Sequence, residues 1–238
     1  MSLGALTFRV VSEAMSLRAA VEARLGPTVD RVYAREGLLI GRPGLGEAGE
    51  KAAWMAYESG EIVLRRSRRE QDVVEAAVFH LIALRSAVES PLLPLRLRTV
   101  MLDSGSAVLV DPRAIYDVAG HDRWYAAHGC DVLPTTIALV DPATVELILP
   151  EQDVDDRVPT GRHRIEEFIL RRGEESPLGG ADVLLALAAV VVRDRERDLQ
   201  PILEQIDRLV TDHGDRVRLL PRGEITDAVK QYAHRQEE

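Results

Sequence analysis

Short apolar stretches, many of them alternating with polar residues, recur along this chain of 238 residues, and longer helical repeats separate them. Alternation with a period of two predicts strands, whereas apolar residues three or four positions apart predict helices. Strands are expected at 6–12, 36–43, 164–172 and 215–221, and hairpins at 52–67, 98–111 and 135–150. Helices are expected at 16–24, 70–88, 113–128, 176–192, 198–214 and 224–236.

This order of hairpins and helices is typical of a mixed α/β fold rather than of a strict alternation of strand and helix. The clearest early helix, 70–88, carries Ala77, His80 and Leu81 at helical spacing. Two prolines interrupt the pattern within 89–96, and we place a domain boundary near them. The chain is therefore expected to hold a small α+β domain at 1–90 and a core domain with a helical C-terminal part at 91–238.

The formal net charge of −9 and a pI near 5.3 argue against broad binding of nucleic acid or of anionic membranes. The one basic cluster, at 65–70, is short and has no aromatic partners, so it predicts a solvated edge. The chain has no run of about 18 apolar residues and no signal-peptide pattern, so we expect no membrane span. The single cysteine, Cys130, fits a reducing compartment, and a cytoplasmic protein is expected.

The segment 106–120 has the pattern of a buried strand, a tight turn and the start of a helix, a junction that holds phosphate in many α/β proteins. In such loops glycines let successive N–H groups point at the phosphate, a lysine adds charge and a serine or threonine holds magnesium. Here the turn begins Asp111-Pro112-Arg113 and contains no glycine or lysine as far as Tyr116. The turn therefore lacks the groups that bind a triphosphate.

The scaffold around this turn nevertheless follows a known order of elements. Gly105, the strand 107–110, Gly129 and the strand and turn at 138–142 follow one another as they do in the HPr kinase-like family, which the chain resembles. The resemblance covers roughly 90–235 and is carried by the segments 91–150, 164–192 and 203–229. It implies an HPr kinase/PEP carboxykinase-like P-loop-type core.

At the catalytic positions implied by the resemblance, the chain departs from the family. The Gly-rich loop falls on 111–116, the acidic pair falls near Thr135-Thr136, and the early histidine falls near 96–98. None of these positions carries the catalytic side chain, so we assign no catalytic residue, no metal and no cofactor. The sequence therefore favours a pseudokinase-type accessory or interaction protein, a pseudoenzyme that binds a protein or peptide partner in a bacterial biosynthetic or regulatory system.

The alternative is a ligand-binding protein or enzyme with a remodelled anion pocket that acts on a phosphorylated or carboxylated small molecule. A helix N-terminus after the degenerate turn still favours an anion. The candidate ligand-binding residues of this remnant pocket are Asp111, Arg113, His121, Asp122 and Arg123. A third alternative, a phosphotransferase, would use a different lysine such as Lys51.

Other motifs have simpler interpretations. The glycines of 44–49 spell G-x-G-x-x-G, but the segment that follows is too short for a dinucleotide-binding crossover, so a flexible connector is expected. His121, Asp122, His128, Cys130 and Asp131 are metal-ligand types, but capping and surface roles fit them better. We expect the Cys130 thiol to be buried and inert. The apolar helix at 181–192 belongs either to the core or to a contact between subunits, which leaves a homo-oligomer open.

Overall fold

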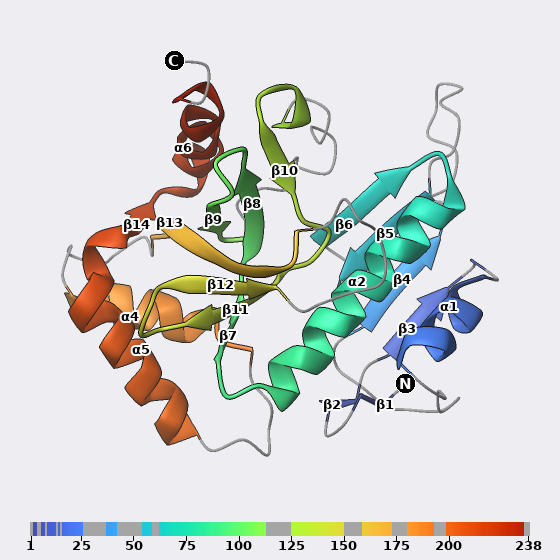
Figure 1. The fold of residues 1–238 in the computed structure, drawn as a ribbon, viewed down its shortest axis with the longest axis horizontal. Coiled ribbons are helices and arrows are strands. Elements are labelled where there is room, and N and C mark those ends of the chain that lie inside the picture. Colours follow the sequence, from blue (N-terminus) through green and yellow to red (C-terminus); the bar gives the residue numbers. More distant parts are fainter. Residues whose placement is uncertain are drawn as a thin grey trace.

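The computed structural model is a mixed α/β fold, as the sequence predicts (Figure 1). It contains an eight-stranded mixed sheet, a four-stranded sheet and a separate pair of short strands. The structure describes residues 2–3, 6–7, 9–12, 14, 16–25, 37–41, 54–58, 62–112, 125–149, 159–172, 180–192 and 199–235.

The N-terminal part is built on the four-stranded sheet, whose strand order is β3-β4-β5-β6. Strands β3 and β4 are parallel, and the other neighbours are antiparallel. Buried and half-buried residues alternate along β5, because successive side chains of a strand point to opposite faces. The elements here are β1 (Ser2–Leu3), β2 (Leu6–Thr7), β3 (Arg9–Ser12), α1 (Ser16–Leu25), β4 (Gly37–Gly41), β5 (Trp54–Glu58), β6 (Ile62–Ser67) and α2 (Glu70–Glu89).

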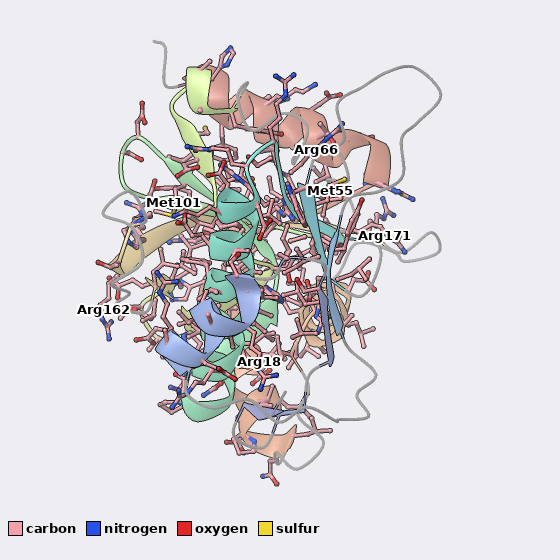
Figure 2. The ribbon with its side chains drawn as sticks, turned by 90° about the vertical axis from the view of Figure 1, so that its right-hand side faces the viewer. Arg18, Met55, Arg66, Met101, Arg162 and Arg171 are labelled. Atoms are coloured by element: carbon pink, nitrogen blue, oxygen red, sulfur yellow. The ribbon has the colours of Figure 1, made fainter. Side chains whose placement is uncertain are left out.

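Helix α2 joins this sheet to the rest of the molecule. Its residues Ala77, Val78 and Leu81 have no exposed surface. They pack in one cluster with side chains of the four-stranded sheet, which Figure 2 shows edge-on, and with Ile137 and Leu139 from much later in the chain. The domain boundary near residue 90 remains a prediction, but the core on its N-terminal side includes residues from beyond it.

The eight-stranded sheet has the order β10-β8-β9-β13-β12-β11-β7, and β14 also pairs with β13. Strand β13 has 11 residues, lies in the middle of this strand order and joins the two halves of the sheet. Its first residues pair antiparallel with β12, and the residues from Ile165 onward lie parallel to β9 and then to β14. The strands are β7 (Leu93–Arg96), β8 (Arg98–Leu102), β9 (Ala107–Val110), β10 (Cys130–Val132), β11 (Ile137–Asp141), β12 (Glu146–Leu149), β13 (Gly161–Arg171) and β14 (Val217–Leu220).

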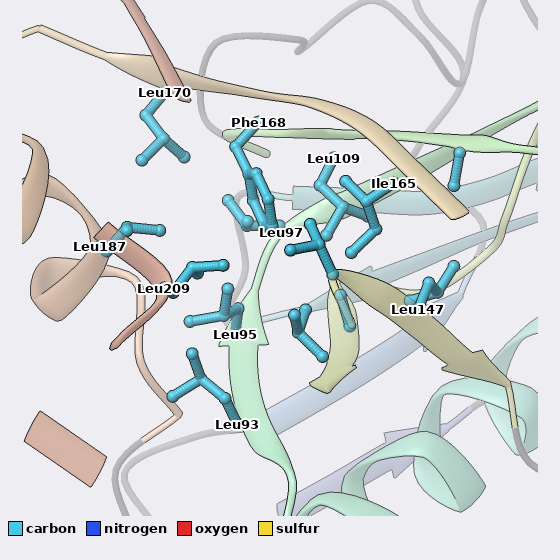
Figure 3. Packing of buried hydrophobic residues seen from close by; sticks show 14 of the residues in the cluster. Leu93, Leu95, Leu97, Leu109, Leu147, Ile165, Phe168, Leu170, Leu187 and Leu209 are labelled. Carbon is cyan, nitrogen blue, oxygen red and sulfur yellow. The ribbon is translucent and has the colours of Figure 1, made fainter. Parts of the chain in front are cut away.

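Each face of this sheet is covered by C-terminal helices. Leu109 and Phe168 face a cluster that includes Leu187 of α4 (Gly180–Ala189) and Leu209 of α5 (Leu199–His213), as Figure 3 shows. Val108, Val110 and Ile169 point the other way, toward buried side chains of α6 (Arg222–Arg235). Every residue of β9 is buried because helices cover both faces of the sheet at this strand. This explains why the sequence of β9 is an uninterrupted apolar run rather than an alternation of apolar and polar residues.

The predicted hairpins are confirmed at β5–β6, β8–β9 and β11–β12. Gly105 occupies the second of these turns with φ +80°, a conformation that favours glycine. Helices α1, α2, α5 and α6 confirm four of the predicted helices, and every end agrees within two residues. Gly214 follows α5 directly and begins a short 3₁₀ turn, Gly214–Arg216.

Two expectations are corrected. The apolar helix predicted at 176–192 ends at Ala189, because Val190 and Val192 turn to hydrogen-bond the outer edge of β7. These bonds run from the N–H of Arg96 to the Val190 carbonyl, at 2.5 Å, and from the N–H of Val192 to the Pro94 carbonyl, at 2.9 Å. The strand predicted to start at 164 begins at 161, since its first residues pair with β12. Within the described part of the chain, no helix combines the length and the apolar character needed to cross a membrane.

Candidate functional site

The turn after β9 is the candidate phosphate site of the sequence, and the structure describes its first two residues. The N–H of Asp111 donates to the Ile169 carbonyl of β13, at 3.0 Å, so it is already used in the sheet. Pro112, which is buried, has no N–H to offer. The Asp111 residue itself is only 9% exposed. The start of this turn therefore provides no N–H donor for a phosphate, and it adds a carboxylate.

The other residues of the predicted remnant pocket, Arg113, His121, Asp122 and Arg123, lie outside the described residues. So do most of the helix predicted at 113–128, of which Tyr125–Ala127 is helical, the glycine motif at 44–49 and Lys51. The anion-pocket alternative and the lysine alternative therefore stay predictions.

A second group of polar residues is buried where α2 meets both sheets. We call Glu58, His80, Arg96, Thr135 and Thr136 the junction cluster. Glu58, His80 and the two threonines have no exposed surface, whereas the Arg96 side chain is 21% exposed. Four separate segments supply them: the end of β5, the middle of α2, the end of β7 and the two residues before β11.

Glu58 is the centre of the junction cluster. Its Oε1 lies 3.3 Å from a guanidinium nitrogen of Arg96 and 3.8 Å from Nε2 of His80. Its other carboxylate oxygen accepts a hydrogen bond from the Thr136 hydroxyl. A carboxylate is tolerated in such a dry place only when it is paired and hydrogen-bonded. Arg96 pairs with this carboxylate and Thr136 hydrogen-bonds one of its oxygens, whereas Oε1 accepts no hydrogen bond from the described residues.

His80 links Glu58 to Thr135. Nδ1 of His80 lies 3.2 Å from the Thr135 hydroxyl, which also accepts the N–H of Ile137 at 3.1 Å. The order of carboxylate, imidazole and hydroxyl is that of an activated nucleophile. However, all three side chains are completely buried, and 3.8 Å between imidazole and carboxylate exceeds hydrogen-bond length. The Thr135 hydroxyl therefore has no exposed surface in the described structure, and its contact with His80 holds α2 to the start of β11.

Arg98 adds a further buried contact between the same parts of the chain. It is 1% exposed, and its guanidinium donates to the Val63 carbonyl of β6 at 2.5 Å. Strand β6 is an edge of the four-stranded sheet, and an edge carbonyl in a dry place needs a donor. The arginine therefore satisfies a carbonyl of one sheet from a strand of the other.

The predicted inert thiol is confirmed as buried. Cys130 is 3% exposed, and burial together with the nearby Asp103 carboxylate raises the pKa of its thiol to about 11. Burial likewise raises the pKa of Tyr125 to about 12. Within the described part of the chain, no three His, Cys, Asp or Glu side chains are grouped so that they could hold a metal ion.

Sequence reasoning missed the junction cluster, although two of its members carried a signal. His80 lies on the apolar face of its helix, and Glu58 follows Trp54 and Ala56 at the alternate positions that point inward. A histidine and a glutamate at buried positions each require a polar partner. The partners, Arg96 and the threonine pair, come from segments far along the chain, which local patterns do not bring together.

Comparison with known proteins gives no relative. No protein family, no curated protein and no solved structure matches the chain. The resemblance to the HPr kinase-like family therefore stays a prediction.

Proposed function

We propose that the protein is a non-enzymatic interaction protein built on an HPr kinase-like scaffold, in which the former nucleotide site no longer binds ATP in the usual way. Its partner would be a protein or peptide in a bacterial biosynthetic or regulatory system. The proposal rests on how the positions that are catalytic in the family are used in this chain.

The proposal is supported by the use of the residues onto which the resemblance carries these positions, because they belong to the junction cluster and to the turn after β9. By the resemblance, the acidic pair of the family would fall near Thr135 and Thr136, whose hydroxyls bond to His80 and Glu58. The early histidine of the family falls near Arg96, which pairs with Glu58. Side chains at the former catalytic positions therefore hold the sheets and α2 together, so they are not available to a nucleotide.

The electrostatics of these positions also oppose metal–nucleotide binding. Magnesium prefers carboxylate and phosphate oxygens, and a threonine hydroxyl already committed to a carboxylate is a poor substitute. The carboxylate of Asp111 at the start of the turn would repel a polyphosphate.

Isothermal titration calorimetry with Mg-ATP tests this proposal directly. We expect no binding heat up to millimolar nucleotide, with the full chain and intact fold verified by circular dichroism. A micromolar dissociation constant for Mg-ATP would refute the proposal. Thermal stabilisation by phosphorylated metabolites that disappears in Arg113→Ala would instead favour the anion-pocket alternative.

A further inference from the structure

We draw no further inference here: the strongest candidate, the exposed apolar surface of α4 and α5 at Leu185, Leu199 and Leu203, carries no proposal because nothing in the structure shows what covers it, and the adjoining segments 173–179 and 193–198 lie outside the described residues.

Discussion

Replacing Glu58 by glutamine tests how much the junction cluster contributes to stability. The change keeps the shape and the hydrogen bond from Thr136, but it removes the negative charge that faces Arg96 at 3.3 Å. At an effective dielectric constant of about 20, two unit charges at that distance attract by about 5 kcal/mol before desolvation is counted. Because the Arg96 side chain is 21% exposed, solvent relieves part of the loss when its partner disappears.

We therefore expect Glu58→Gln to lower the free energy of unfolding by about 2–4 kcal/mol. In a chain of this size that corresponds to a fall of roughly 5–15 °C in the melting temperature. Urea unfolding followed by circular dichroism at 222 nm measures the effect. A double-mutant cycle with Arg96→Gln separates the pair from the other contacts, and the two changes should be strongly non-additive.

The exposed pair of Glu146 and Arg162 is a matched control, since its N–O distance is 2.7 Å and both side chains face solvent. The hydrogen bond from Arg162 holds the pKa of Glu146 below its usual value, yet the same cycle on this pair should give little coupling, because exposed pairs are screened. If Glu58→Gln unfolds at the same urea concentration as the native chain, or if the two cycles give equal coupling, the assigned role of the junction cluster is wrong.

Two further predictions concern the region around β10. In urea titrations, Gly129→Ala should destabilise the fold by more than Gly105→Ala. Both glycines have positive φ, but a Cβ added at Gly129 would lie 2.3 Å from a side-chain oxygen of Asp103, whereas a Cβ added at Gly105 would have no atom within 4 Å. Equal losses would contradict this close approach. Burial raises the pKa of Cys130 from 9.0 to about 11, so the folded chain holds the thiol proton more tightly and stability falls as pH rises through that window. Between pH 8 and 10 the free energy of unfolding of the native chain should fall by about 1 kcal/mol for this reason. The variant Cys130→Ala should lose less stability over the same pH range.

Local patterns predicted most elements because each had its own signal. The hairpins had a polar or glycine-containing turn between two apolar runs, and the helix at 70–88 had a long apolar face. The end of α4 was missed for a different reason. Val190 and Val192 fit a helix by composition, but the edge of β7 offers them backbone hydrogen bonds, and that edge lies almost a hundred residues earlier in the chain.

The candidate site was predicted less well than the fold. The absence of glycine and lysine after β9 was readable from the sequence, and the structure adds that the Asp111 N–H is used by Ile169. The junction cluster depends on pairs separated by 55 and 78 residues, so its geometry exists only after tertiary packing. A buried glutamate can be inferred from strand alternation, but its arginine and its threonine cannot.

Strand β13 has a consequence for how the chain is made. Because β9 and β12 both pair with this one late strand, neither can complete its hydrogen bonding until residues 161–171 have left the ribosome. A nascent chain paused before that point would present two apolar strand edges at once, and such edges favour association with other chains. Emergence of residues 161–171, rather than of the boundary near residue 90, is therefore the stage at which the edges of β9 and β12 become paired, whereas the edge of β13 that pairs with β14 waits for residues 217–220.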